Sequence, residues 1–252
     1  MESTENIKTF LERFRNYYST VERFKIDSDR ARIQGLLSGW KALDLATADY
    51  EKRIASSYNI FTILKHISNK EVITHTPFIA DLLNIHGKHK QGGLFYLEFL
   101  EQLNLPNKET FIADETILFS IEEPKYIGPK DKDNNEGGLI DILISYRDAK
   151  KHFAIAIENK RDAPDQQRQL LRYYKYLKDV HRDNYLLVYL SPDGRSPTEY
   201  SIDKASFDTL SSQHKIKVVS YNQHIKNLLR NTINKVEAKN VHSLISQYLE
   251  II

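Results

Sequence analysis

Two carboxylates and a lysine interrupt or end short apolar segments in the middle of the chain. In FAIAIENK, the apolar residues 153–157 are followed by Glu158 and Lys160. In GGLIDILIS, Asp141 lies within a run of Ile and Leu. Side chains on a strand repeat every second residue, so Glu158 and Lys160 are expected on the same side. A carboxylate inside an apolar strand is costly unless it is paired or binds a metal.

These residue types favour either a metal site or an ion pair. RDAKK separates LIDILISY from HFAIAIEN and predicts a β-hairpin, in which Asp141 and Glu158 can meet near one end. Two carboxylates form a hard oxygen site that suits Mg²⁺ or Mn²⁺, and such an ion could activate water and neutralise charge on a phosphate. Lys160 could stabilise the nucleophile or the developing negative charge. The alternative is an Asp–Lys or Glu–Lys ion pair at a sheet edge.

The Glu-x-Lys spacing alone is not specific. Glu123-Pro-Lys125 and Glu237-Ala-Lys239 have the same spacing, but neither ends an apolar run. We therefore interpret both as solvated, and the prediction of a site rests on the strand context of Glu158.

The elements around these residues follow from the hydrophobic periodicity. Helical spacing predicts helices in IKTFLERFRNYYSTVERF, WKALDLATADYEKRIAS, NIFTILKHIS, TPFIADLLNIH and GLFYLEFLEQL. Thr76 and Pro77 suit an N-cap and a first helical position, and Asn104 and Pro106 end the last of these helices.

After Pro106 the pattern becomes that of strands. ETILFSIEEP, NYLLVYLSP and KIKVVSY are expected strands, and KYIGPKDKDNNEGG is a turn-rich connector. APDQQRQLLRYYKYLKDV is an expected helix with Pro164 near its start, DGRSPTEYSIDKASFDTLSSQ shows little period, and YNQHIKNLLRN and VHSLISQYLEII are expected helices. This order predicts an α/β protein with a mixed central β-sheet flanked by helices. Residues 1–55 would form an extra N-terminal helical layer, and residues 56–252 the main domain.

Composition narrows the function classes. The 252 residues contain no cysteine, which excludes disulfides and thiolate metal sites. The N-terminus resembles no signal peptide and no apolar run is long enough to span a membrane, so we expect a cytoplasmic protein. A formal net charge of +2 argues neither for nor against a nucleic-acid partner. The chain has no P-loop and no Gly-x-Ser-x-Gly motif.

The ordered segments GGLIDILIS, FAIAIENK and DQQRQLLRYYKYL resemble the PD-(D/E)xK nuclease superfamily. They resemble in particular a bacterial branch with Ile-Asp-(Ile/Leu)-Leu-Ile, Ile-Glu-Asn-Lys and Gln-Leu-x-x-Tyr motifs, and the resemblance extends over about residues 58 to 230. It implies a restriction-endonuclease-like core of order αβββαβ. It also implies an Mg²⁺-dependent (or Mn²⁺-dependent) phosphodiesterase that acts on nucleic acid, with DNA favoured over RNA.

The resemblance also assigns roles to individual residues. Asp141 and Glu158 match the metal-binding carboxylates, the backbone carbonyl of Asn159 is an implied ligand, and Lys160 matches the catalytic lysine. The residue before the aspartate, a proline in the family pattern, is Ile140 here, a departure that removes no metal ligand.

The next helix carries further candidates. Gln169 and Tyr173 lie on one face and match the Gln-x-x-x-Tyr element that borders the active site in exonuclease-like branches. The alternative is that Tyr173 packs in the core and Gln169 lies at the surface. Arg168 and Arg172 could contact phosphates, although a solvated basic face explains them equally well.

Three other positions are weaker candidates. The resemblance also implies an acidic metal ligand on an N-terminal helix, and Glu71 is our choice for it, with an exposed glutamate as the alternative. His75 could contact phosphate or help to orient Glu71, but it is better explained as a capping or core residue. The loop HGKHK is a weak zinc signal, and we expect Lys88 and Lys90 to lie near phosphate.

Two functions remain open from the sequence. The first is a metal-dependent nuclease that hydrolyses phosphodiester bonds in DNA, in a bacterial defence or DNA-processing role. The second is a non-catalytic nucleic-acid-binding or scaffold protein with the same fold. The oligomeric state is also open, with a homodimer among the options.

Overall fold

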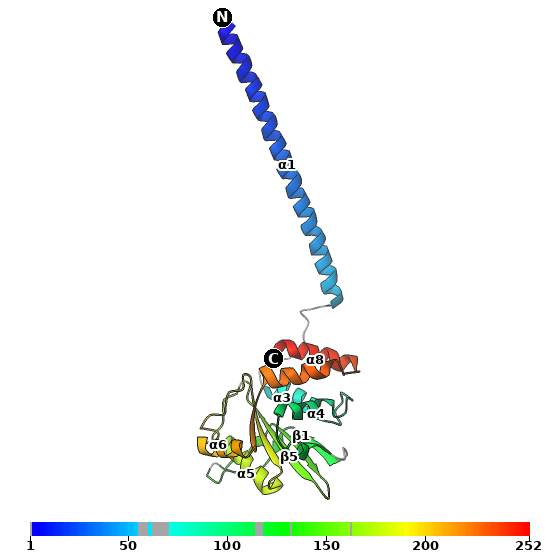
Figure 1. Cartoon of the computed structure of the whole chain (residues 1–252), viewed down its shortest axis with the longest axis vertical. Coiled ribbons are helices and arrows are strands. Elements are labelled where there is room, and N and C mark those ends of the chain that lie inside the picture. The colour runs from blue at the N-terminus through cyan, green and yellow to red at the C-terminus, as the bar shows by residue number, and fades with distance from the viewer. Residues whose placement is uncertain (1, 55–59, 62–70, 114–117, 132, 162) are drawn as a thin grey trace. The chain divides into compact units, whose positions relative to one another are not determined.

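The computed structural model describes residues 2–54, 60–61, 71–113, 118–131, 133–161 and 163–252. Contacts between residues divide the chain into two compact units, Met1–Tyr58 and Asn59–Ile252, which are drawn in Figure 1. No helix in the described ranges is long and apolar enough to cross a membrane.

The first unit contains one long helix, α1 (Glu2–Ile54). The first predicted helical segment and residues 40–54 of the second are parts of this single helix, and Gly35 and Gly39 lie inside it without interrupting it. All described side chains of α1, those of residues 6–47, are exposed.

The second unit is built on a mixed five-stranded sheet of order β1-β4-β5-β6-β7. Its strands are β1 (Phe119–Glu122), β4 (Ile142–Arg147), β5 (His152–Asn159), β6 (Tyr185–Ser191) and β7 (Ile216–Ser220). The strands β1, β4 and β5 pair antiparallel, whereas β5, β6 and β7 pair parallel. The predicted β4–β5 hairpin is confirmed, since its strands are consecutive and antiparallel.

Helices cover both faces of this sheet (Figure 1). One face packs against α3 (Glu71–Leu83), α4 (Leu94–Leu103), the π-helical turn η3 (Tyr221–Ile225), α7 (Lys226–Ile233) and α8 (Lys239–Ile251). The other face packs against α5 (Gln169–His181) and α6 (Lys204–Ser212). Alternate residues of β5 enter the two cores, because strand side chains alternate between faces. The predicted mixed sheet with flanking helices is confirmed.

The connector before β4 is more ordered than its turn-rich sequence suggests. It contains a second, two-stranded sheet of β2 (Lys125–Tyr126) and β3 (Leu139–Ile140). A short 3₁₀ helix, η1 (Lys108–Phe111), precedes β1.

Two predicted helix boundaries are wrong. The helix α3 begins at Glu71, so Pro77 lies inside it at the cost of one backbone hydrogen bond, and Thr76 is no N-cap. The helix α5 begins only at Gln169, because the Asp165 carboxylate accepts hydrogen bonds from Thr198 N and Oγ1 and holds the preceding segment in another conformation. Most of the helix predicted in NIFTILKHIS lies outside the described residues.

One helix was not predicted. The segment KASFDTLSS forms α6, whose N-cap Asp203 accepts a hydrogen bond from Ser206 N at 2.9 Å. Its polar composition conceals the helical period, since only Leu210 of α6 is buried.

Candidate active site

Asp141 and Glu158 lie opposite each other on neighbouring strands. The β4–β5 register pairs Ile142 with Ile157, and one further step along both strands places Asp141 across from Glu158. Residues opposite each other in an antiparallel pair project to the same face. The Oδ2 atom of Asp141 also accepts a hydrogen bond of 2.8 Å from the backbone N–H of Asn159. The two acidic residues therefore meet at one end of the hairpin.

The backbone pairing between strands is interrupted at Asp141, where the side chain makes the hydrogen bond to Asn159. Asp141 separates β3 from β4, and the pairs β1–β4 and β2–β3 share one register that places Pro124 opposite it. Because proline has no N–H, it cannot donate to a ladder. Sheet pairing thus stops at Asp141, and its carboxylate binds the next strand instead.

Glu158 and Lys160 form a buried ion pair. Lys160 Nζ lies 2.5 Å from Glu158 Oε1, and the two side chains are only 4% and 1% exposed. The amide of Gln169 donates a second hydrogen bond, of 2.7 Å, to the same Glu158 oxygen. Burying two charges has a large desolvation cost, so a buried ion pair is weak evidence that the pair stabilises the fold. Both charges are instead held in a defined place that water scarcely reaches.

Gln169 and Tyr173 project from α5 onto this pair. Gln169 Nε2 lies 3.0 Å from Tyr173 Oη, and the Tyr173 hydroxyl donates to the carbonyl of Leu139. Burial, and then the charge of Glu158, raise the pKa of Tyr173 well above its usual value, so the hydroxyl remains a donor. Tyr173 is a buried packing residue and also borders Glu158, whereas Gln169 is buried rather than at the surface.

Asn159 faces the opposite layer. Its amide donates to Thr76 Oγ1 of α3 and accepts a bond from the Tyr221 hydroxyl of η3, both at 3.0 Å. Within a strand, the N–H and C=O of one residue point to the same side, so the Asn159 carbonyl faces the side where Asp141 lies. The end of β5 is thereby held from both layers.

The two arginines predicted to contact phosphate differ in exposure. Arg172 is buried, with Nε donating to the Gly137 carbonyl at 2.9 Å and Nη1 donating to the Gln167 carbonyl. Through these two bonds it supports the segment that leads to Asp141 and the residues just before α5. Arg168 is exposed at the start of α5, with Nη1 3.4 Å from Asn135 Oδ1.

The lysines of the HGKHK loop are exposed but lie at the far end of α3. Lys88 and Lys90 follow Leu83, whereas Thr76 near the start of α3 contacts Asn159. At 1.5 Å per residue, these two points on α3 are about 10 Å apart. His89 is buried and bonded through both ring nitrogens, to Asn84 O and Gln91 N, which explains it as a loop-forming residue.

The structure describes the side chain of His75 but not that of Glu71, the two candidates on the first turns of α3. Glu71 is the first residue of α3, but its side chain lies outside the described side chains. His75 is buried, and its Nδ1 lies 2.8 Å from Tyr248 Oη and 3.2 Å from an Arg161 nitrogen. It is a core histidine of the layer that supports Asn159.

Glu123 is an acidic neighbour that the sequence reasoning missed. We interpreted it as solvated, but it is half-buried, and burial followed by the charge of Asp141 raises its pKa. The position of Glu123 follows from the register between β1 and β4, which are distant in sequence. In this register Glu123 lies opposite Ile142, next to Asp141.

The donor set suits a hard divalent cation. Asp141 and Glu158 supply carboxylate oxygens and Asn159 a carbonyl, which are the donors that Mg²⁺ and Mn²⁺ favour. Within the described residues, no three His, Asp or Glu side chains gather closely enough to hold an ion by themselves. Two carboxylates completed by backbone and solvent oxygens match the usual coordination of Mg²⁺.

Comparison with known protein families gave a match. A family model described as the PD-(D/E)XK nuclease superfamily matches residues 58–250. Searches of curated proteins and of solved structures gave no significant match. The match covers most of the chain and the whole mixed sheet with its flanking helices, which is consistent with a restriction-endonuclease-like fold. The chain belongs to the PD-(D/E)XK nuclease superfamily.

Proposed function

We propose that this protein is a metal-dependent nuclease that hydrolyses phosphodiester bonds, with DNA as its substrate. The observation that carries the proposal is the convergence of Asp141, Glu158 and Lys160 on one face of the sheet at the end of β5. Membership of the superfamily supports a nuclease-like activity and a nucleic-acid substrate.

Each of the three side chains has a distinct role in this proposal. Asp141 and Glu158, with the Asn159 carbonyl, would hold Mg²⁺ or Mn²⁺. When bound, the ion supplies Lewis-acid activation of water and neutralises charge on the scissile phosphate. Lys160 places a fixed positive charge beside Glu158, where it stabilises negative charge that develops on the phosphate oxygens.

The surrounding residues keep these groups in position before substrate arrives. Gln169 holds the Glu158 carboxylate from α5, and the Asn159 N–H holds the Asp141 carboxylate. Preorganised charges need no rearrangement during reaction, which is the main source of electrostatic catalysis. A decayed, non-catalytic site would not need both carboxylates, the lysine and their supporting hydrogen bonds.

The test is cleavage of labelled single- and double-stranded DNA, and of RNA, by the full chain with Mg²⁺, with Mn²⁺ or with EDTA. We expect metal-dependent cleavage of DNA that falls at least about 100-fold in Glu158→Gln and in Lys160→Met. Each single change leaves the buried partner residue unpaired. The double variant Glu158→Gln/Lys160→Met replaces both charges and is therefore assayed as well.

A matched control is the exposed ion pair between Glu136 and Lys175, whose N–O distance is 2.7 Å. The variants Glu136→Gln and Lys175→Met should retain wild-type cleavage. Undiminished cleavage by the Glu158 and Lys160 variants would contradict the assignment of the site. DNA binding by the wild type without any cleavage would favour the scaffold function instead.

A further inference from the structure

The helix α1 carries an unusual amount of exposed apolar surface. Large apolar residues occur along its described length, and they are 47% to 75% exposed. The isolated helix has no core of its own, and most helical stability in proteins comes from packing an apolar face rather than from intrinsic propensity. A helix of 53 residues with this surface requires a partner.

The spacing of the apolar residues identifies another helix as that partner. Six positions repeat at alternating intervals of three and four residues, which is the a/d pattern of helices that pair along their length: Ile7, Phe10, Phe14, Tyr17, Val21 and Phe24. Leu11 and Tyr18 widen this stripe. We call these eight residues the heptad stripe.

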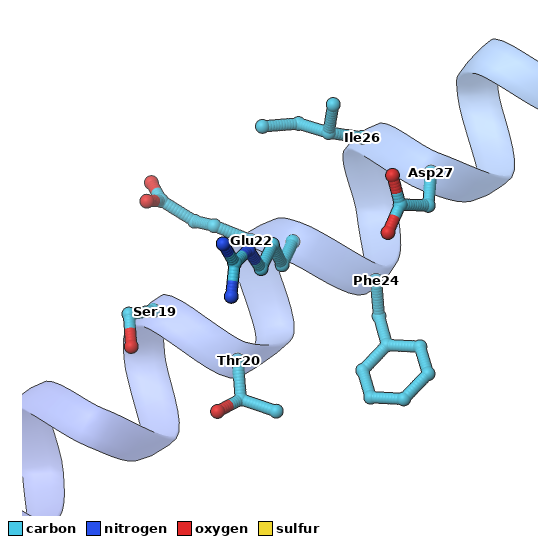
Figure 2. Close-up of a pocket in the computed structure, with 7 residues that line it drawn as sticks. Ser19, Thr20, Glu22, Phe24, Ile26 and Asp27 are labelled. Atoms are coloured by element: carbon cyan, nitrogen blue, oxygen red, sulfur yellow. The ribbon is translucent and has the colours of Figure 1, made fainter.

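The stripe ends near Phe24. Figure 2 shows Phe24 and Ile26 projecting to different sides of the helix, with the polar Ser19 and Glu22 on neighbouring turns. A second apolar group with the same spacing follows: Ile33, Leu36, Trp40 and Leu43. The heptad stripe therefore forms a surface of its own, about five turns long.

The second unit of the chain offers no matching surface among its described residues. Its large exposed apolar side chains are seven, and no described element carries more than one: Leu97, Leu118, Tyr126, Leu139, Val180, Tyr200 and Leu244. Scattered single side chains of this kind are normal on a protein surface. They cannot cover a continuous stripe of eight residues.

The charges of α1 argue against a phosphate-rich partner. Residues 2–54 contain ten basic and nine acidic side chains, which alternate in sign along the helix. Helices that bind nucleic acid or anionic lipid through electrostatics carry a clear basic excess. A balanced mixture of charges is instead compatible with a second copy of the same helix.

We propose that the protein self-associates through the heptad stripe, with α1 of one copy packing against α1 of a second copy. Burying the eight side chains would remove on the order of 800 Å² per copy from water, about the contribution of one partner to a standard stable interface. This inference does not depend on the proposed nuclease activity.

The test is the molar mass of the full chain in solution, measured by light scattering between about 1 and 100 µM without metal or nucleic acid. We expect a mass of two or more copies of the 29.4 kDa chain for the wild type. The double variant Phe10→Glu/Phe14→Glu, which places charges in the stripe, should have the mass of one copy.

The matched control is Asn16→Glu/Ser19→Glu, which adds the same two charges to the polar side of the following turn and should keep the wild-type mass. A thermal unfolding transition shared by all three proteins would show that the second unit is folded. A monomeric wild type at 100 µM would overturn the proposal, as would stripe and control variants of equal mass. Binding of a monomeric wild type to anionic vesicles or DNA through α1 would also overturn it.

Discussion

The carboxylate of Glu158 is held by two different groups at one oxygen. Lys160 Nζ and Gln169 Nε2 both lie within 2.7 Å of Oε1, one from the residue that follows β5 and one from α5. The lysine supplies a positive charge. The Gln169 amide orients the Glu158 carboxylate, because α5 fixes the position of Gln169. In the proposed reaction Gln169 is thus a positioning residue for the metal-binding carboxylate.

We expect Gln169→Ala to lower kcat by about 10- to 100-fold with little change in KM, because a small misplacement of a reacting group is enough for a loss of this size. The matched control is Gln167→Ala, whose backbone carbonyl still accepts the Arg172 bond and which should remain active. Steady-state cleavage kinetics measure both values. Equal loss in both variants, or a change in KM alone, would contradict the positioning role.

At the scale of elements, the end of β5 is tied to helices in both layers. Glu158 is bound by α5, and the next residue, Asn159, is bound by α3 through Thr76 and by η3 through Tyr221. Both bonds to the Asn159 amide are buried. Removing one partner of a buried hydrogen bond leaves the other unsatisfied and costs more than the bond contributes.

Thr76→Val and Tyr221→Phe should therefore each lower the free energy of unfolding by about 1 to 3 kcal/mol, as measured by urea denaturation. Tyr200→Phe, at an exposed tyrosine, is the control and should change stability by less than about 0.5 kcal/mol. If Tyr221→Phe is as stable as Tyr200→Phe, the Asn159 amide is not anchored as the structure shows.

At the scale of the whole molecule, folding stability should depend on pH through His181. This residue at the end of α5 is 7% exposed, and its Nδ1 finds no hydrogen-bond partner among the described residues. Burial, and then the charge of Arg147, lower its pKa to about 4. The unfolded chain, with an ordinary histidine, takes up a proton first as the pH falls. The stabilising contribution is therefore complete above about pH 6.5 and is lost between there and pH 4.

Between pH 7.5 and pH 5, we expect the wild type to lose on the order of 1 to 2 kcal/mol more stability than His181→Gln. His242→Gln, at an exposed histidine of α8, should keep the wild-type pH dependence. Urea midpoints at several pH values provide the measurement. Identical slopes for the wild type and His181→Gln would show that this histidine is not the source.

The sequence predicted those parts of the fold that local patterns determine. Alternation and apolar runs predicted the β4–β5 hairpin, and the superfamily motifs pointed to Asp141, Glu158 and Lys160. Glu123 was missed because its neighbourhood depends on register between distant segments.

Two other differences between sequence and structure have separate physical causes. Burial of Arg172 follows from its hydrogen bonds to two backbone carbonyls, Gly137 before Asp141 and Gln167 before α5, which no helical pattern reveals. The helix α6 was missed because a helix with one buried residue has almost no hydrophobic period.

The alternation of side chains at the end of β5 also bears on which positions can vary. Glu158 faces one core and Asn159 the other, so the two cores on opposite faces of the sheet converge on adjacent residues of one strand. Repacking of either core therefore changes the position of the peptide unit between Glu158 and Asn159. Mutational tolerance should therefore be low at places such as Thr76 and Tyr221, which touch neither ion nor substrate, and compensating changes should tend to arise in pairs across the sheet.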